Sequence, residues 1–154
     1  MADSPSLQER SPQTPVDWDR HYDLRWRVLR EPWGQPPGSE RDELDSASIH
    51  VALWDGDHAV AGGRLHFNSP LEAQVRYMAV EPRRQGEGLG SRILVLLEAR
   101  ALAAGAHSVV LNAREEAAGF YLGRRYQVTG PAGLLFGSIP HLRMEKRLES
   151  GESR

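Results

Sequence analysis

The stretch Arg83-Arg84-Gln85-Gly86-Glu87-Gly88-Leu89-Gly90 restricts the fold more than any other part of the sequence. An apolar segment at 75–80 precedes it, and a helical pattern at 91–104 follows it. Three glycines at alternate positions leave the backbone almost bare of side chains, so successive N–H groups can approach a bulky anion. The N–H groups of the first helical turn lack partners within the helix and together carry about half a positive charge. A strand, a glycine turn and a helix start therefore predict a cradle for a pyrophosphate.

Two well-known phosphate-binding glycine motifs differ from this stretch in their spacing. A Walker loop ends in Gly-Lys-Ser or Gly-Lys-Thr, and this stretch has no such ending. A dinucleotide-binding fingerprint reads G-x-G-x-x-G, whereas this stretch reads G-x-G-x-G and no second βαβ half follows it. A glycine-rich connection that binds nothing is the remaining alternative, because short glycine patterns are weak evidence on their own.

The composition is that of one domain with a core of ordinary size: of 154 residues, 40% are apolar and 26% are charged. A formal net charge of -2 gives no general argument for a nucleic acid or membrane partner. The absence of cysteine excludes disulfides, thiolate metal sites and a cysteine nucleophile. No apolar run approaches the roughly 20 residues of a membrane span, and the N-terminus lacks the apolar core of a signal peptide. The expected location is therefore the cytoplasm.

Hydrophobic periodicity predicts helices and strands along most of the chain. We expect helices at 17–30, 91–104 and 113–123, and strands at 49–53, 59–67, 73–80, 108–112, 126–128 and 139–148, with 134–136 in the sheet or in an adjoining loop. The strand–helix–strand unit within 73–112 should pair in parallel, with a right-handed crossover.

The two ends of the chain are polar. Residues 1–15 carry three prolines, which predicts a disordered leader, and residues 149–154 form a polar tail. A single domain is therefore expected over 16–148. Within it, Asp17 is the expected N-cap of the first helix.

Two strands carry informative side chains. The alternation in 49–53 is typical of a strand with one buried face. Arg64 and His66 share one face of the next strand, where either a cleft or an exposed edge would accommodate them.

Motifs on both sides of the glycine turn resemble those of the GNAT family of N-acyltransferases. Met78-Ala79-Val80-Glu81-Pro82, followed by Gln85-x-x-Gly88-x-Gly90, is similar to the acyl-CoA motif A of that family. Leu111-Asn112-Ala113, then Ala117-x-x-Phe120-Tyr121 and Arg125-Tyr126, is similar to motif B.

The end of the chain extends the resemblance. Ile139-Pro140-His141 followed by Met144 resembles the ending of a bacterial subgroup that includes the ElaA-like proteins. Together the motifs cover residues 17–148. Two positions depart from the family pattern: Arg125 stands where the family often has glycine, and Arg114 stands where asparagine is common.

The resemblance implies an α/β fold of the α+β type. A mixed, twisted β-sheet is flanked by helices and splays into a V at the acyl-CoA site, next to a bulge near Met78–Val80. The pantetheine arm would bond to this backbone, and the pyrophosphate would rest on the N–H groups of the glycine turn. Arg83 and Arg84 would either meet the adenosine phosphates or stay in solvent. The implied cofactor-binding residues are Met78, Ala79, Val80, Arg84, Gln85, Gly86, Glu87, Gly88, Leu89, Gly90 and Asn112.

The implied activity is that of an acyl-CoA-dependent N-acyltransferase. It would transfer acetyl from acetyl-CoA to a primary amine by direct attack in a ternary complex, without a metal. A non-catalytic acyl-CoA-binding sensor or partner module is the alternative. In such a fold the acidic stretch 40–45 lines the acceptor site and would favour a cationic amine, unless it is a solvated loop. A small amine and a protein amine both stay open as acceptors, and so does a homodimer; no nucleic acid or membrane partner is expected.

Two residues are the implied catalytic groups, Tyr121 and His141. The Tyr121 hydroxyl would protonate the departing thiolate, since a phenol with a pKa of about 10 stays protonated at neutral pH; a core tyrosine is the alternative. His141, His66, Glu81 and a water relay are the candidates for the base, and histidine has the suitable pKa range. Asn112, at the end of an apolar strand, would bond to the cofactor or hold the splay open.

Overall fold

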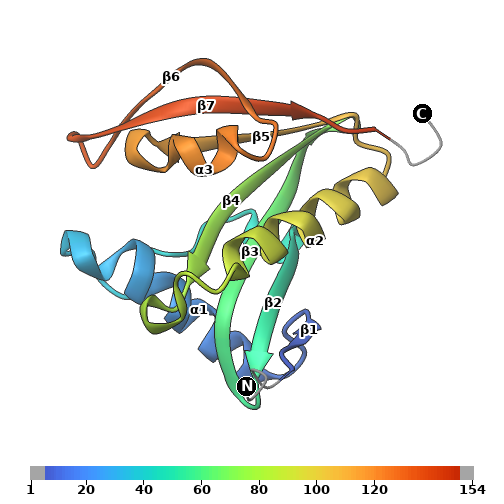
Figure 1. The fold of residues 1–154 in the computed structure, drawn as a ribbon. Helices are drawn as coiled ribbons and strands as arrows, with labels where there is room; N and C mark the ends of the chain where they lie inside the picture. Colours follow the sequence, from blue (N-terminus) through green and yellow to red (C-terminus); the bar gives the residue numbers. More distant parts are fainter. Residues whose placement is uncertain (1–5, 150–154) are drawn as a thin grey trace. The chain divides into compact units, whose positions relative to one another are not determined.

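The computed structural model describes residues 6–149, and the chain divides into two compact units. Unit 1 is Met1–His66 together with Tyr77–Leu97, and unit 2 is Phe67–Arg76 together with Glu98–Arg154. Three elements contribute to both units: β3 (His58–Ser69), β4 (Glu72–Val80) and α2 (Leu89–Ala103) (Figure 1). The single domain expected over 16–148 stays a prediction.

The remaining elements each lie within one unit. Unit 1 also contains β1 (Gln8–Arg10), α1 (Pro15–Leu29), η1 (Glu31–Trp33), η2 (Asp45–Ala47), β2 (Ile49–Asp55) and η3 (Pro82–Arg84). Unit 2 also contains β5 (Ser108–Arg114), η4 (Glu115–Ala117), α3 (Ala118–Leu122), β6 (Gln127–Leu135) and β7 (Ile139–Arg147). Within residues 6–149, no helix combines the length and the apolar character that crossing a membrane requires.

The seven strands form a mixed sheet in the order β1-β2-β3-β4-β5-β7-β6. The first residues of β4, Glu72–Gln74, pair in parallel with Ser108–Val110 of β5, as the strand–helix–strand pattern predicts. The β1–β2, β2–β3, β5–β7 and β6–β7 pairs are antiparallel. The predicted mixed α/β fold with flanking helices is therefore confirmed, while the predicted opening between the two central strands stays a prediction.

The disordered leader is wrong for residues 6–15. β1 pairs with the edge of β2, and Gln8 lies opposite Trp54. The Trp54 indole N–H donates to the Arg10 carbonyl at 3.1 Å, and the Arg10 guanidinium lies 4.2 Å from the Trp54 ring. Backbone pairing with β2 thus orders a polar segment that buries little apolar surface of its own. Residues 1–5, and 150–154 of the expected tail, lie outside the described residues.

Helix α1 begins at Pro15, two residues earlier than predicted, and its N-cap is Thr14 and not Asp17. The Thr14 hydroxyl accepts from the Asp17 N–H at 3.1 Å, and the Asp17 carboxylate accepts from the Thr14 N–H at 3.3 Å, which completes a capping box. A hydrogen bond from Arg10 to the same carboxylate is the main cause that lowers the pKa of Asp17 to about 2. The start of α1 is therefore tied to β1.

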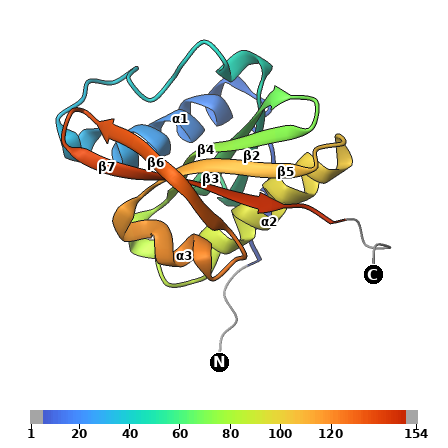
Figure 2. The same ribbon diagram turned by 90° about the horizontal axis from the view of Figure 1, so that it is seen from above.

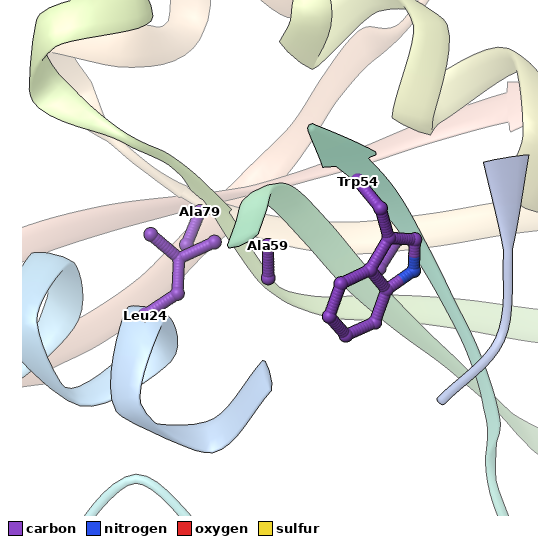
Figure 3. Packing of buried hydrophobic residues seen from close by; sticks show 5 residues of the cluster. Leu24, Trp54, Ala59 and Ala79 are labelled. Atoms are coloured by element: carbon purple, nitrogen blue, oxygen red, sulfur yellow. The ribbon is translucent and has the colours of Figure 1, made fainter. Parts of the chain in front are cut away.

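Unit 1 is a three-layer structure around β3. On one face Leu24 of α1 packs into a cluster with three alanines and an indole (Figure 3). On the other face Ile93 and Leu97 of α2 approach Gly63 so closely that a Cβ there would lie 2.8 and 2.9 Å from them. Because helices cover both faces, Val51–Trp54 of β2 is buried throughout, and the expectation of one buried face is wrong. The other members of the Leu24 cluster are Ala52, Trp54, Ala59 and Ala79.

Unit 2 differs from the expected pattern at two places. The helix expected at 113–123 is replaced by an extension of β5 to Arg114, the turn η4 and the short α3, because Asn112 and Arg114 pair with Arg143 and His141 of β7. Most of the residues expected at 126–128 and 134–136 belong, with the glycine-containing residues between them, to one strand, β6, which pairs antiparallel with β7 (Figure 2). Two register shifts let β6 pass this glycine-containing segment without leaving the sheet.

Arg125 occupies a backbone position that favours glycine, with φ of 75°. The Arg125 N–H donates to the Leu122 carbonyl and the Tyr126 N–H to the Tyr121 carbonyl, at 3.2 and 3.1 Å. These bonds form a Schellman motif, whose left-handed residue is usually glycine. The departure from the family pattern noted at Arg125 therefore has a cost in strain.

Replacing Arg125 with glycine is expected to stabilise the protein. Relief of the left-handed strain, about 1–2 kcal/mol, exceeds the extra entropy of an unfolded glycine, about 0.5–1 kcal/mol. The free energy of unfolding should therefore rise by about 0.5–1 kcal/mol in urea unfolding. Arg125→Ala is the control, since alanine keeps the strain; an equal gain in both variants would mean that the arginine side chain, and not the backbone, is unfavourable.

Candidate functional site

The glycine turn has the backbone conformation that an anion cradle requires. Gly86 and Gly88 have φ of 88° and 81°, and a Cβ at either position would meet no atom within 4 Å. Helix α2 begins directly afterwards at Leu89, whose side chain is only 3% exposed and so anchors the helix start in the core. Open space on the side-chain face of both glycines, beside a fixed helix N-terminus, fits a pyrophosphate.

The polar side chains of the turn are partly engaged with each other. Arg84 donates to Asp55 at 3.0 Å and to Glu87 at 3.0 Å, and the hydrogen bond to Glu87 is the main cause that raises the Arg84 pKa. A phosphate contact of Arg84 would therefore compete with two carboxylates. Gln85 and Arg83 are exposed, as is Glu87. The assignment of these residues to acyl-CoA binding stays a prediction.

The strand that leads into the turn carries a left-handed residue. Tyr77 has φ of 62°, directly before the Met78–Val80 segment where a bulge is predicted. A bulge of this type normally places glycine in the left-handed position. For an L-residue the conformation costs about 1–2 kcal/mol, so the surroundings of Tyr77 must hold it. The side chain of Ala79 packs against α1, and Met78 faces Gly63 on the other side of the sheet.

A buried ion cluster surrounds Tyr77. We define the Arg25–Asp45 cluster as Arg25, Asp42, Asp45, Arg64 and Tyr77. Arg25 and Arg64 both donate to one oxygen of Asp45, at 2.9 and 3.2 Å. Arg64 also donates to Asp42 at 2.6 Å, and the Tyr77 hydroxyl donates to Asp42 at 3.2 Å. Arg64 is 0% exposed and Arg25 is 2% exposed. Because the cluster contains two arginines and two aspartates, their charges balance inside unit 1.

The cluster corrects two expectations from sequence. The acidic stretch 40–45 is only partly solvated: Asp42 and Asp45 turn inward to arginines, while Glu43 is exposed. Glu40 is also buried and accepts from the Gly38 N–H and from Arg41. Arg64 lies neither in an open cleft nor at an exposed edge. Helical periodicity assigns Arg25 to the polar face of the helix, and only its acidic partners in space show its buried role.

The two aspartates of the cluster stay ionised. Burial is the largest single effect and would raise the pKa of Asp42, but the hydrogen bonds from Arg64, the Leu44 N–H and Tyr77, together with the Arg64 charge, outweigh it and the pKa falls to about 2. Burial also opposes ionisation of Asp45, yet its bonds to the Asp42 N–H and to the two arginines lower its pKa. A low pKa makes both carboxylates poor proton acceptors at neutral pH.

A histidine pair adjoins this cluster. The His50 Nε2 lies 2.9 Å from the Asp45 carbonyl, which can only accept, so Nε2 carries the hydrogen and Nδ1 accepts. The His21 Nε2–H then donates to that Nδ1 at 3.2 Å. Burial is the main cause that lowers both pKa values, to about 3 for His21. Both histidines are therefore neutral and structural at physiological pH.

Acid should destabilise the protein through this pair. As pH falls below the ordinary histidine pKa of 6.5, the unfolded chain binds protons that folded His21 binds only near its pKa of about 3. Stability present above pH 6.5 is therefore lost toward pH 3, by about 1.4 kcal/mol per pH unit for each such proton. His21→Phe should flatten this dependence by one proton in urea unfolding at pH 4–7. An unchanged slope would exclude His21 as the source.

The three candidate bases have different hydrogen-bond partners. Glu81 accepts both Arg27 Nη groups at 3.1 and 3.2 Å, which holds it in an ion pair. His66 Nδ1 accepts from Arg64 at 3.1 Å. His141 Nδ1 donates to the Ile139 carbonyl at 2.9 Å, which leaves Nε2 as the nitrogen that can take a proton. Of the three, His141 is thus the one whose side-chain hydrogen bond goes to a backbone carbonyl and not to an arginine, which fixes its tautomer.

In unit 2 the strand register relates His141 to Asn112. Arg114 lies opposite His141 and Asn112 lies opposite Arg143. Residues two apart on a strand share a face, so Asn112 and His141 are diagonal neighbours on one face of the β5–β7 pair. Asn112 is exposed on β5. Two predicted site residues are thereby brought to the same face.

Tyr121 lies on α3 with its ring edge-on to Phe120 and Tyr126, at 4.9 and 5.8 Å between ring centres. Burial raises the pKa of Tyr121 to about 12, so its hydroxyl stays protonated. Tyr126, in contrast, is 1% exposed and donates to Glu98 at 2.8 Å, and Glu98 also accepts from Lys146 at 2.9 Å. Tyr126 therefore has a core role, while the role of Tyr121 stays a prediction.

Comparison with known proteins finds similar proteins over most of the chain. The model of the acetyltransferase (GNAT) family matches residues 18–124. YjcF, an uncharacterised N-acetyltransferase of Bacillus subtilis (strain 168), is 33% identical over 123 residues, which cover 80% of this chain and 87% of that protein. Escherichia coli ElaA has a similar fold, with a TM-score of 0.77 at 17% identity over 92% of this chain and 98% of ElaA. An aminoglycoside 6'-N-acetyltransferase in complex with coenzyme A gives 0.76 at 19% identity, over 95% and 99% of the two chains.

Proposed function

Because the chain belongs to the acetyltransferase (GNAT) family and is an acyl-CoA-dependent N-acetyltransferase, we propose that it transfers acetyl from acetyl-CoA directly to a primary amine in a ternary complex. The observation that carries the donor site is the pair of left-handed glycines, Gly86 and Gly88, with open space beside them at the start of α2. In this proposal the N–H groups of Gln85–Gly90 hold the pyrophosphate and the backbone of Met78–Val80 holds the acyl arm.

In the proposed reaction one C–N bond forms, one C–S bond breaks, the amine nitrogen loses a proton and the thiolate gains one. The lone pair of a neutral amine attacks the thioester carbonyl carbon, and negative charge develops on the carbonyl oxygen, where backbone N–H groups of Met78–Val80 stabilise it. The C–S bond then breaks, and the thiolate takes a proton from the Tyr121 hydroxyl. The amine nitrogen gives up its proton to His141 Nε2. A phenol that stays protonated and a histidine tautomer that can accept support these two assignments.

The acceptor is proposed to be a primary amine, either a small molecule or a protein amine. The acidic stretch 40–45 gives little reason to expect a positively charged acceptor, because most carboxylates of this stretch are paired with arginines. Recognition of the acceptor must then depend on shape and on hydrogen bonds more than on net charge.

A screen of amines and peptides with acetyl-CoA, read out as free thiol, tests this function. We expect thiol release that depends on the acceptor, and binding of CoA and acetyl-CoA in calorimetry without comparable binding of NAD or ATP. Tight CoA binding without thiol release over a broad panel would indicate a binding module in place of an enzyme. Equal affinity for NAD would contradict the donor site itself.

A further inference from the structure

Tyr77 combines a large side chain with a backbone conformation that large side chains rarely adopt. Its φ of 62° lies in the left-handed region, inside strand β4. Such outliers persist only where the surroundings hold them, and they gather at functional sites. The segment that follows, Met78–Val80, is the one proposed to contact the acyl arm.

The contacts of Tyr77 come from three elements. Its hydroxyl is bonded to Asp42 of the loop before β2, at 3.2 Å. The guanidinium carbons of Arg25 on α1 and Arg64 on β3 lie 4.5 and 4.8 Å from its ring centre. Both arginines are fixed by Asp45, so the Tyr77 ring lies against guanidinium groups that buried ion pairs hold in place. The cluster therefore holds both ends of the side chain.

The backbone consequence follows from what φ describes. Rotation about the N–Cα bond of Tyr77 turns the peptide after this residue relative to the peptide before it. The strand thus enters Met78–Val80 with its peptide planes in an orientation that an extended residue would not give. We infer that Tyr77 is a positioning residue: through its left-handed backbone, held by the Arg25–Asp45 cluster, it orients the N–H groups of Met78–Val80 toward the thioester carbonyl. This inference rests on the proposed function.

A core role alone would give Tyr77 the same contacts but a different dependence on the residue type. If the ring only fills space, then any substitution that removes the ring has a similar effect. If the left-handed backbone matters, asparagine should serve better than valine, because asparagine tolerates this region and a β-branched residue does not. Both substitutions remove the ring and the hydroxyl, so they form a matched pair.

Infrared difference spectroscopy of acetyl-CoA labelled with ¹³C at the carbonyl carbon reads the orientation directly and needs no acceptor. Hydrogen bonds to the carbonyl oxygen move its stretching band to lower wavenumber. We expect the shift in the natural protein and in Tyr77→Asn, and its loss in Tyr77→Val. Asp42→Asn, which weakens the hold on the hydroxyl, should reduce the shift in part. The affinity for CoA, which lacks the acetyl carbonyl, should be similar in all four proteins.

The outcomes separate this inference from the proposed function. Equal shifts in Tyr77→Asn and Tyr77→Val, whether both retained or both lost, would overturn the role of Tyr77. A natural protein that binds acetyl-CoA without a carbonyl shift would overturn the polarisation and this inference with it, and absence of binding would overturn the donor site. If Tyr77→Val does not fold, Tyr77→Ala takes its place, since alanine also disfavours the left-handed region.

Discussion

Gly88→Val is expected to abolish measurable binding of CoA and acetyl-CoA. A valine side chain would occupy the open space beside Gly88 that the phosphates are proposed to fill, and a β-branched residue cannot adopt the φ of 81° that the turn requires. Loss of the backbone contacts to a pyrophosphate should lower the affinity at least about 100-fold, since each 1.4 kcal/mol corresponds to a factor of ten. Isothermal titration calorimetry with CoA measures the effect.

Gly105→Val is the matched control for strain. Gly105 also has a left-handed φ, 96°, with no atom within 4 Å of a Cβ, but it lies just past the other end of α2. We expect a similar loss of thermal stability in both variants and a loss of CoA affinity only in Gly88→Val. Equal CoA affinities in the two variants would remove the glycine turn from the donor site.

Tyr121→Phe is expected to lower kcat by about 10²–10⁴, the usual contribution of a positioned general acid. The substitution keeps the ring and its edge-on contacts with Phe120 and Tyr126. Affinity for acetyl-CoA should change little, because the hydroxyl acts only when the thiolate departs. The residual rate should depend more strongly on the leaving ability of the thiol. Single-turnover measurements, with an acceptor from the amine screen, test this directly.

Tyr126→Phe provides the contrast. Its hydroxyl donates to Glu98 in the core, so its removal should lower the free energy of unfolding by about 1–3 kcal/mol with turnover nearly intact. The pair thus separates a chemical from a structural hydroxyl on neighbouring rings. A natural rate in Tyr121→Phe would assign Tyr121 to the structural class.

The features that sequence predicted well are those encoded by neighbours in the chain. The glycine turn, the parallel β4–β5 pair and the motifs of the GNAT family depend on residues within about one supersecondary unit. The same holds for α1, whose start was misplaced although Thr14-x-x-Asp17 is the pattern of a capping box. The sequence thus contained the pattern of the correct N-cap, Thr14, although Asp17 was predicted in its place.

Other features depend on residues that the sequence does not place together. Arg25 meets Asp45, and Asp45 meets Arg64, across three separate elements. Helical periodicity alone places Arg25 on the polar face of α1, where exposure is expected. Likewise β1 is three residues long, and only its partner β2 makes it a strand. Partners of this kind become visible only when the chain is folded.

The balanced charges of the Arg25–Asp45 cluster limit how the sequence can drift. Loss of Asp45 alone would leave two buried guanidinium groups opposite a single carboxylate, and breaking a buried ion pair in this way costs about 3–5 kcal/mol. That cost is comparable with the whole stability of a small domain, about 5–15 kcal/mol. Neutral variation at these positions must therefore proceed by coupled substitutions, with an acid and its arginine exchanged together. Libraries that vary one of these positions at a time should yield few stable variants, whereas libraries that vary an acid and its arginine together should yield more.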